Sequence, residues 1–206
     1  MSGPVVVVLA AGRGSRFQSP EHKLVQPFGA SSVLGTTLGK VLASQLPMVV
    51  VATAAMSEVA GRSVATRDVV VVPEVGQTRT LPLGMGYSIA CGVGARPDAT
   101  GWLVLPGDMP MVKPETLQAV ARALEDHTIA YAQYRGRRGH PVGFAAELFS
   151  ELATLSGDDG ARRLIARYPA HGVEVDDPGV LIDIDTEADL ASLRASTSPA
   201  APQPHP

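Results

Sequence analysis

The stretch Val5-Val-Val-Val-Leu-Ala-Ala-Gly-Arg-Gly-Ser-Arg-Phe17 joins an apolar run directly to a glycine-rich segment. Its first part, Val5–Leu9, has four valines and a leucine with no polar alternation, which is typical of a strand buried on both faces of a parallel sheet. Similar apolar runs follow at Met48–Ala52, Val69–Val72 and Trp102–Leu105. These runs predict the strands of a largely parallel sheet.

Segments with a helical period lie between and after these runs. They are Ser32–Ala43, Gly84–Val93, Pro114–Asp126, Glu147–Leu155 and Ala161–Tyr168. A variant capping box, Thr186-Glu-Ala-Asp189, predicts the start of a last helix that ends at about Arg194. Alternation of this kind indicates a three-layer α/β fold, in which a mostly parallel twisted sheet carries helices on both faces. Ligands of such sheets bind at the edge where the strands run into the helices.

Length and composition describe an ordinary globular chain. The 206 residues are 45% hydrophobic and 18% charged, and the formal net charge of -3 gives no basic field for nucleic acid. No apolar run approaches the roughly 20 residues that span a bilayer, and the N-terminus lacks the basic stretch of a signal peptide. The lone Cys91 excludes an internal disulfide and a cysteine-rich zinc site. We therefore expect a cytoplasmic protein with neither a nucleic-acid nor a membrane partner.

At about 150 residues per domain, the length predicts one domain, which we assign to residues 1–195. The remaining segment, 196–206, holds four prolines and no large apolar side chain. It cannot bury enough surface to offset its ordering entropy, so we predict that it is disordered. The arginine- and glycine-rich segment Tyr134–Pro141 is predicted to be a mobile loop over the ligand site.

The glycines after the first strand lie where a ligand of such a sheet would bind. Gly12 and Gly14 let backbone N–H groups approach a ligand closely and point toward an anion, and Arg13, Arg16 and Lys23 would bring cationic groups to the same place. Together these residues favour a polyphosphate. A Walker loop is excluded because no Gly-Lys-Ser/Thr follows, and a dinucleotide fingerprint would need a third glycine or alanine. From spacing alone, a tight turn with solvated arginines explains the segment equally well.

A first acidic motif, Leu105-Pro-Gly-Asp-Met-Pro110, follows the run Trp102–Leu105. An acidic residue at the carboxyl end of a strand faces the ligand edge of the sheet, so Asp108 would do so here. A carboxylate in that position suits Mg²⁺, which prefers few carboxylates together with substrate phosphates. The alternative is an aspartate that only caps a turn.

A second acidic motif is Leu181-Ile-Asp-Ile-Asp-Thr-Glu-Ala-Asp189. A strand over Leu181–Ile184 would place Asp183 and Asp185 on one face. Two like charges so close tolerate each other best around a cation, which predicts a metal site. The alternative is that Asp185 and its neighbour only open the last helix.

The segment Leu9-Ala-Ala-Gly-Arg-Gly-Ser-Arg-Phe17, followed by Lys23-Leu24, resembles the signature of Rossmann-like nucleotidyltransferases that activate sugars, isoprenoid precursors and molybdopterin. The resemblance extends over about residues 4–194. It implies a glycine loop around a triphosphate, with Arg16 and Lys23 neutralising the triphosphate and the departing pyrophosphate. The residues of this segment that it implies in nucleotide binding are Leu9, Ala10, Ala11, Gly12, Arg13, Gly14 and Lys23.

The same family carries Gly-Asp-x-Pro where this sequence has Gly107-Asp-Met-Pro110, and its aspartate binds the metal. The resemblance therefore implies Mg²⁺ held by Asp108. It implies a second ligand at Asp185, with Asp183 as the other choice. The catalytic residues that it implies are Arg16, Lys23 and Asp108.

Later segments resemble the molybdenum cofactor cytidylyltransferase group within that family. They are Arg138-Gly-His-Pro-Val-Gly-Phe144 and Leu155-Ser-Gly-Asp-Asp-Gly-Ala-Arg162, and they imply acceptor contacts by Arg138, His140 and Arg162. The segment Gly84–Ser88 resembles the one that touches base and ribose, which implies nucleotide contacts by Gly84, Met85, Gly86 and Ser88. Leu-Ala-Ala-Gly, in place of Leu-Ala-Gly-Gly, marks users of cytidine in this family.

The resemblance implies transfer of CMP from CTP to a phosphorylated acceptor, molybdopterin carrying its metal, with release of pyrophosphate. CTP and a molybdopterin-type molecule are then the partners, with a molybdenum hydroxylase apoenzyme as a further candidate. A sugar-phosphate nucleotidyltransferase is the nearest alternative, because the gap of seven between Arg16 and Lys23 matches sugar-nucleotide members, whereas molybdopterin members commonly have five. A nicotinamide-dependent reductase is a further alternative, but this sequence lacks the third glycine of the dinucleotide-binding motif. A non-catalytic chaperone that inserts cofactor into a molybdenum hydroxylase would not need to retain the catalytic residues.

Overall fold

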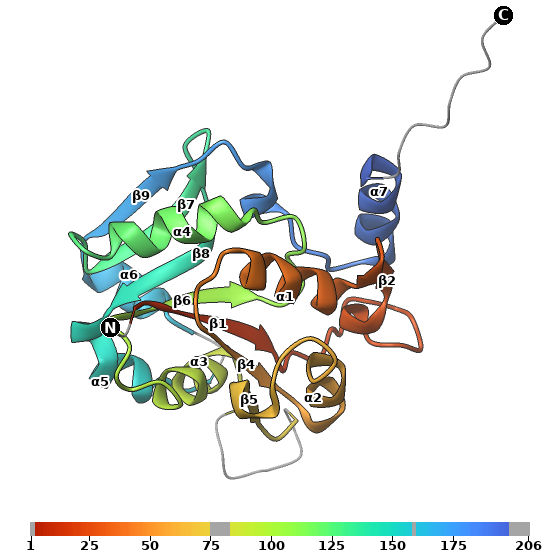
Figure 1. The fold of residues 1–206 in the computed structure, drawn as a ribbon, viewed down its shortest axis with the longest axis horizontal. Coiled ribbons are helices and arrows are strands. Elements are labelled where there is room, and N and C mark those ends of the chain that lie inside the picture. The colour runs from red at the N-terminus through yellow and green to blue at the C-terminus, as the bar shows by residue number, and fades with distance from the viewer. Residues whose placement is uncertain (1–2, 75–82, 158–159, 198–206) are drawn as a thin grey trace, which may run out of the picture.

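A seven-stranded sheet runs through the computed structural model, which describes residues 3–74, 83–157 and 160–197 (Figure 1). The strand order is β5-β4-β1-β6-β8-β7-β9, and a separate two-stranded ribbon pairs β2 with β3. The strands are β1 Val5–Ala10, β2 Pro27–Phe28, β3 Ser31–Ser32, β4 Met48–Ala52, β5 Val69–Val71, β6 Gly101–Pro106, β7 Ile129–Tyr134, β8 Arg137–Ala145 and β9 Ala170–Glu174.

The sheet is mostly parallel, as its apolar runs predict. β1 pairs in parallel with β4 and β6, β4 with β5, and β7 with β9. β8 is antiparallel to both of its neighbours, β6 and β7. The carboxyl ends of β1 and β6 therefore meet at one edge, while β8 runs in the opposite direction beside β6.

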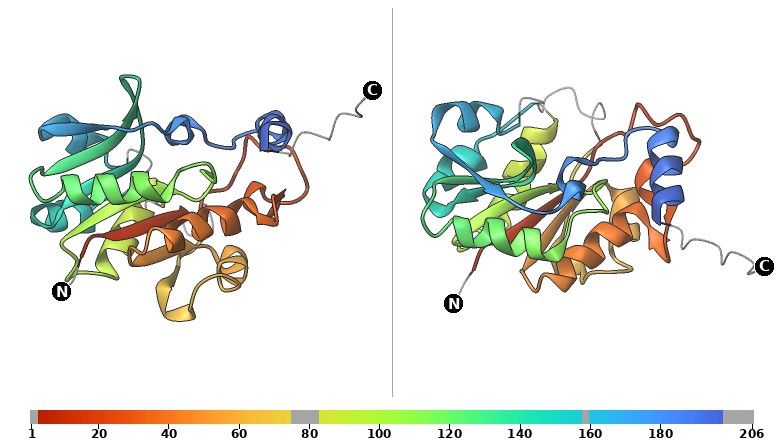
Figure 2. Two further views of the ribbon diagram at one scale, coloured as in Figure 1. Left: turned by 45° about the horizontal axis from the view of Figure 1, so that its top comes forward. Right: turned by 90° about the horizontal axis from the view of Figure 1, so that it is seen from above.

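Helices cover both faces of this sheet, as the turned views show (Figure 2). α1, α2 and α4 contribute to an apolar cluster on one face, and α3, α5 and α6 contribute to a cluster on the other. The helices are α1 Val33–Ala43, α2 Ala54–Ala60, α3 Met85–Gly94, α4 Pro114–Ala123, α5 Phe149–Ala153, α6 Arg162–Arg167 and α7 Glu187–Thr197. The predicted three-layer α/β arrangement is confirmed.

The side chains of the central strand β1 alternate between the two apolar clusters. Val6 and Val8 belong to one cluster and Val5 and Val7 to the other, and all four are buried. Burial on both faces explains why this run shows no polar alternation. The carboxyl end of this strand carries the glycine-rich segment.

The segment Tyr134–Pro141, predicted as a mobile loop, belongs instead to a β-hairpin. β7 and β8 pair up to Tyr134 and Arg137, so that only Arg135 and Gly136 form the turn, with φ of 49° and 75°. The prediction was wrong because only Gly136 serves the turn, whereas Gly139 lies within β8 and packs against Val180. A Cβ at Gly139 would lie 2.9 Å from the side chain of Val180. The projecting end of this hairpin is visible in Figure 2.

The strand expected at Leu181–Ile184 does not form. The 3-10 turn η4, Pro178–Leu181, occupies part of this segment, and the chain then continues without regular structure to α7. The physical reason is that the segment crosses the carboxyl end of β6 and meets a loop there. Its hydrogen bond runs from the Ile184 backbone N–H to the Asp108 carbonyl, at 3.0 Å.

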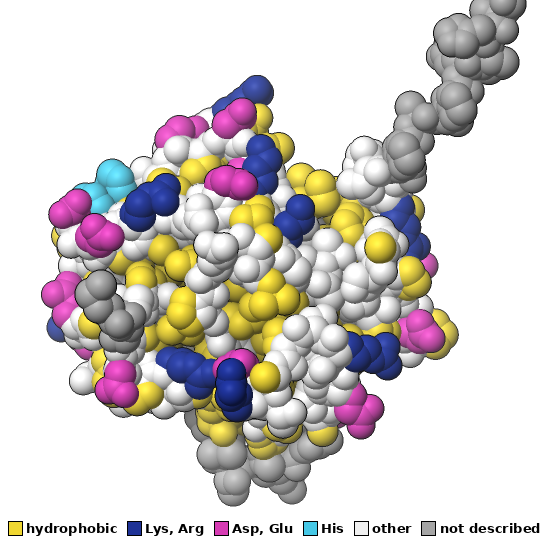
Figure 3. Space-filling view, viewed as in Figure 1, with side chains coloured by type: hydrophobic (Ala, Val, Ile, Leu, Met, Phe, Trp, Pro, Cys, Tyr) yellow, Lys and Arg dark blue, Asp and Glu magenta, His cyan; other side chains and the backbone are white. Residues whose placement is uncertain are grey.

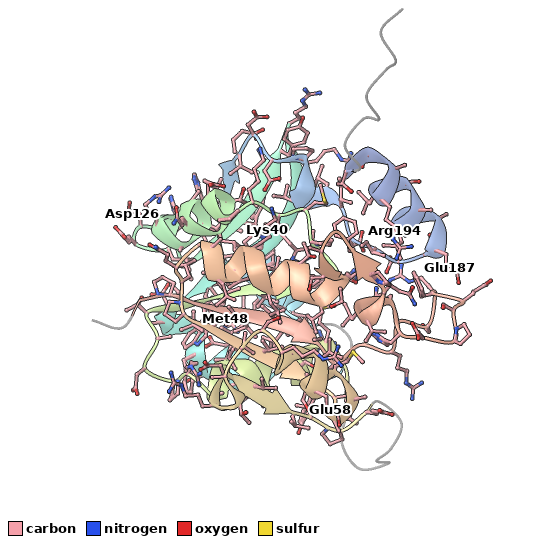
Figure 4. The ribbon with its side chains drawn as sticks, turned by 45° about the vertical axis from the view of Figure 1, so that its right-hand side comes forward. Lys40, Met48, Glu58, Asp126, Glu187 and Arg194 are labelled. Atoms are coloured by element: carbon pink, nitrogen blue, oxygen red, sulfur yellow. The ribbon has the colours of Figure 1, made fainter. Side chains whose placement is uncertain are left out.

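The last helix, α7, begins as predicted. The Thr186 N–H donates to the Asp189 carboxylate at 2.8 Å, and the Asp189 N–H donates back to the Thr186 hydroxyl at 3.2 Å, which is the reciprocal arrangement of a capping box. α7 lies beside the β2–β3 ribbon (Figure 4), where Arg194 donates to the Pro27 carbonyl. The helix includes residues 196 and 197 of the predicted tail, and residues 198–206 lie outside the described residues.

Within the described ranges, no helix combines the length and apolarity needed to cross a bilayer. On the face drawn in Figure 3, acidic and basic side chains are interspersed, with no broad area of one sign. This distribution agrees with the small net charge of -3.

Candidate active site

A cavity of about 710 Å³ opens at the carboxyl ends of β1 and β6. Such a volume is typical of small-molecule sites. The cavity brings together most of the residues that the sequence singles out. These are Leu9, Ala11, Gly12, Arg13, Gly14, Arg16, Lys23, Gly84, Met85, Ser88, Asp108, Arg138, His140, Asp183 and Asp185.

The glycine loop after β1 turns sharply and is clipped to the following 3-10 turn, η1 Lys23–Val25. Gly14 has φ of 60°, a conformation that favours glycine, and its carbonyl accepts from the Phe17 N–H at 2.9 Å. His22 holds the loop from the other side: its Nε2 lies 2.8 Å from the Gly12 carbonyl, and its Nδ1 accepts from the Leu24 N–H. Because Nδ1 is the acceptor, Nε2 carries the proton and donates to Gly12.

A compact cluster of four charged side chains lies below this loop. The Lys23 ammonium contacts Asp108 Oδ2 at 2.5 Å and Asp185 Oδ1 at 3.0 Å, and Arg16 contacts Asp185 Oδ2 at 2.5 Å. Lys23, Asp108 and Asp185 are 11%, 14% and 18% exposed, whereas Arg16 is 74% exposed. Three of these groups are therefore largely withdrawn from water, and the Arg16 guanidinium reaches in from the surface.

Burial and charge act in opposite directions on the lysine of this cluster. Burial lowers the pKa of Lys23, but the negative charges and hydrogen bonds of Asp108 and Asp185 outweigh it, so that the pKa is raised. Burial, together with the charges of Asp185 and Asp108, raises the pKa of the third carboxyl, Asp183. Asp108 Oδ1 is buried and has no hydrogen-bond partner. The cluster therefore keeps one oxygen ready for a further ligand.

Hydrogen bonds to its backbone hold the Asp108 loop against its neighbours. The Gly107 N–H donates to the Leu9 carbonyl at 2.9 Å, and the Thr37 hydroxyl donates to the Gly107 carbonyl at 2.9 Å. A Cβ at Gly107 would lie 3.0 Å from the Leu9 carbonyl oxygen, so glycine is needed for this approach. The Asp108 carbonyl in turn binds the Ile184 N–H. These bonds explain how Asp183 and Asp185 reach the cavity without the expected strand.

The donor set fits a divalent cation that shares its coordination with a ligand. The described residues contain no group of three or more His, Cys, Asp or Glu side chains arranged to hold a metal ion. Two carboxylates, those of Asp108 and Asp185, meet at one nitrogen, and Asp108 Oδ1 is free. Mg²⁺ binds through one or two carboxylates plus substrate phosphates, which this arrangement could provide.

The β8 strand also lines the cavity, with Arg137, Arg138 and His140. Arg138 lies over the Tyr131 ring, 4.0 Å from its centroid. The ring atom Nδ1 of His140 is buried without a hydrogen-bond partner, and burial lowers the pKa of this histidine. A largely neutral imidazole beside exposed guanidinium groups can bind a ligand that is part anionic and part polar.

Three of the predicted site residues do not line the cavity. Ala10 is fully buried within the sheet. Gly86 packs against another loop, since its N–H donates to the Gly157 carbonyl at 2.8 Å and a Cβ there would lie 2.7 Å from the Ser156 oxygen. Arg162 is exposed at the start of α6. Part of the motif that suggested Arg162, namely residues 158 and 159, lies outside the described residues.

Three polar or charged residues line the cavity without having been predicted as site residues, namely Ser15, His22 and Arg137. Ser15 lies inside the glycine motif and Arg137 next to a predicted residue, so proximity along the chain could have suggested both. His22 gave no such signal. Its contact with Gly12, ten positions earlier, depends on how the segment between them folds back.

Comparisons with known proteins agree with this geometry. Residues 6–173 match the family model described as the MobA-like NTP transferase domain. The crystal structure of Rv0371c from Mycobacterium tuberculosis H37Rv is similar at 32% identity and a TM-score of 0.80, covering 94% of this chain and 98% of that one. The structure of the same protein in complex with manganese is similar at 31% identity and a TM-score of 0.76, with coverage of 94% and 98%.

Curated relatives match over a smaller part of their length. The bifunctional protein GlmU of Halorhodospira halophila is 36% identical over 119 residues, which are 57% of this chain and 24% of that protein. The purine catabolism protein PucB of Bacillus subtilis is 32% identical over 120 residues, 56% of this chain and 58% of that protein. The chain thus matches about a quarter of the first relative and rather more than half of the second.

Proposed function

The chain belongs to the MobA-like NTP transferase family, and from this premise we propose that it transfers CMP from CTP to a phosphorylated acceptor and releases pyrophosphate. We propose a molybdopterin-type molecule as the acceptor and Mg²⁺ as the metal. The Leu9-Ala-Ala-Gly12 segment supports CTP, because in the family that this sequence resembles Leu-Ala-Ala-Gly is typical of the enzymes that use cytidine nucleotides. The Arg138-Gly-His-Pro141 segment supports the acceptor.

One observation carries the proposal. Two cations and two carboxylates from three distant parts of the sequence meet directly beside the glycine loop, with Lys23 bound to both Asp108 and Asp185 and with Arg16 bound to Asp185. A glycine loop with cations suits a triphosphate, and carboxylates beside it suit the cation that accompanies a triphosphate. A protein that only bound or delivered a cofactor would have no need for this combination.

The chemistry requires positioning and charge stabilisation more than a strong base. The acceptor phosphate is already ionised at neutral pH, so its oxygen can attack the α-phosphate of the nucleotide without losing a proton to the protein. The bond from the α-phosphate to the bridging oxygen then breaks, and pyrophosphate leaves with the electron pair. Lys23 and Arg16 would orient the triphosphate and stabilise the negative charge that develops on the leaving group. Asp108 and Asp185 would hold the divalent cation, which supplies further charge neutralisation at the phosphates.

The two sides of the cavity would divide the work of binding. The glycine loop and the start of α3, with Gly84, Met85 and Ser88, would hold the nucleotide. The β8 side, with His140 and Arg138, would hold the acceptor. The antiparallel direction of β8 supports this division. The amino-terminal part of β8, which carries Arg138 and His140, therefore lies at the edge where β1 and β6 end.

A sugar-phosphate nucleotidyltransferase is the second candidate. The 36% identity to the GlmU protein of Halorhodospira halophila favours it, as does the gap of seven residues between Arg16 and Lys23. The two candidates share the nucleotide side of the site and differ at the acceptor side. The acceptor therefore decides between them.

The test is pyrophosphate release with each of the four ribonucleoside triphosphates and Mg²⁺, in the presence of molybdopterin or of a panel of hexose 1-phosphates. We expect release with CTP that depends on molybdopterin. Release that depends on a hexose phosphate would establish the second candidate. Absence of release with every combination, while the folded protein binds none of the four nucleotides, would refute nucleotidyl transfer.

A further inference from the structure

The carboxylates of Asp108 and Asp185 are already occupied by the protein's own cations. Of their four oxygens, Asp108 Oδ2 and Asp185 Oδ1 bind the Lys23 ammonium, and Asp185 Oδ2 binds Arg16. Only Asp108 Oδ1 has no partner, and it is buried. The pair therefore presents a neutralised cluster to a metal ion arriving from solution.

Of the two cations that neutralise the carboxylates, Lys23 is held in the cluster more firmly than Arg16. Its side chain is 11% exposed and bonds to both carboxylates, whereas Arg16 is 74% exposed and bonds to one. Its backbone is set by η1, which His22 ties to the glycine loop. The ammonium group therefore lies between the carboxylates and next to the segment where a triphosphate would bind.

A divalent cation would have to replace this ammonium group to reach both carboxylates. Removal of a buried ammonium leaves two carboxylates facing each other, which is unfavourable unless another positive charge arrives. Asp183 lines the same cavity, but among the residues that the structure describes no three His, Cys, Asp or Glu side chains are arranged to hold a metal ion by themselves. The metal must therefore both displace Lys23 and find its remaining ligands elsewhere.

We propose that Lys23 is the resident counter-ion of the Asp108–Asp185 pair, and that it keeps this pair from binding a divalent cation until the triphosphate draws the ammonium group away. The same side chain then acts first on the carboxylates and afterwards on the phosphates, so that metal and nucleotide enter the site together. The inference deepens the proposed function and rests on it for the identity of the triphosphate. The part that concerns the metal can be tested without any nucleotide.

The experiment is a titration of the purified protein with Mn²⁺ alone, in which electron paramagnetic resonance measures free Mn²⁺. Lys23→Met removes the charge and keeps most of the apolar stem. We expect it to bind Mn²⁺ at least about tenfold more tightly than the wild type, because the repulsion between Mn²⁺ and one positive charge at contact distance is removed. Lys23→Arg keeps the charge and should bind Mn²⁺ as weakly as the wild type.

Two controls make the result specific. Lys40→Met removes a positive charge from α1, outside the cavity (Figure 4), and should leave Mn²⁺ affinity unchanged. Adding Asp108→Asn to Lys23→Met should abolish the gain, because the gain depends on the released carboxylate. If Lys23→Met does not fold, Lys23→Gln replaces it, and the rise of its thermal midpoint with Mn²⁺ is compared with that of the wild type.

The inference is overturned if Lys23→Met binds Mn²⁺ no more tightly than the wild type, or if its gain survives Asp108→Asn. This outcome is separate from a failure of the proposed function. A protein that shows the predicted Mn²⁺ affinities but releases no pyrophosphate would retain the counter-ion role of Lys23 and lose the assigned reaction.

Discussion

Replacing Asp177 with alanine tests how the two acidic segments of the site are held in place. This carboxylate is 1% exposed and joins the segment before α7 to the start of α4. Its Oδ2 accepts from the Lys113 N–H at 2.8 Å and from the Thr116 hydroxyl at 2.7 Å, and its Oδ1 accepts from the Gly179 N–H at 3.0 Å. The sequence analysis did not single out this residue.

The expected loss follows from these three hydrogen bonds. Each contributes about 1–1.5 kcal/mol, and alanine would leave the buried Thr116 and Gly179 donors and the partly buried Lys113 N–H without an acceptor. Asp177→Ala should therefore lower the free energy of unfolding by roughly 3–5 kcal/mol. Because Lys113 is the residue that immediately precedes α4, the substitution also leaves the backbone N–H at the start of that helix without its acceptor.

Urea denaturation followed by circular dichroism measures the change. The matched control is Asp176→Ala, since Asp176 is an exposed neighbour whose backbone carbonyl, and not its carboxylate, binds Lys113. We expect the control to change the free energy of unfolding by less than about 0.5 kcal/mol. A loss below about 1 kcal/mol for Asp177→Ala would refute the reasoning, because it would mean that water or a neighbouring group replaces the carboxylate at little cost.

Four further predictions concern the site and the hairpin. Asp108→Asn should abolish pyrophosphate release while circular dichroism shows an unchanged fold, and an active variant would remove Asp108 from metal binding. Lys23→Ala should raise the activation barrier by about 2–4 kcal/mol, as for loss of a strong oxyanion donor, which kcat measured at saturating nucleotide checks. His22→Ala should raise KM for the nucleotide more than it lowers kcat, since it unclips the glycine loop, and an unchanged KM would contradict that role. The Gln133 side chain, which donates to Glu174, holds the pKa of that carboxyl below its usual value. The wild type should therefore be more stable than Glu174→Gln above the ordinary glutamate pKa and lose this advantage as the pH falls through the lower folded value. Denaturation midpoints between about pH 3 and pH 7 measure this, and a difference that grows toward acid would contradict the sign.

Local sequence patterns alone determined several elements of this protein. The unbroken valine run predicts β1 because burial on both faces removes any polar alternation, and the strand is buried as expected. The Thr186–Asp189 pair predicts the start of α7, because a capping box involves residues only three positions apart. The glycine loop likewise shows its anion-binding character within a few residues.

Tertiary structure alone decided the rest, because the deciding contacts lie far apart along the chain. The local sequence of the β7–β8 hairpin resembles that of a loop. Its strands are defined by the pairing of β8 with β6 and with β7. Asp185 reaches the cavity through a crossing segment and not through a strand. Lys23 bonds to partners 85 and 162 positions away, which no periodicity of the sequence encodes. Neighbouring residues determine short-range steric contacts and hydrogen bonds. Contacts between charged residues far apart in the sequence depend on which strand edges and helix faces pack together.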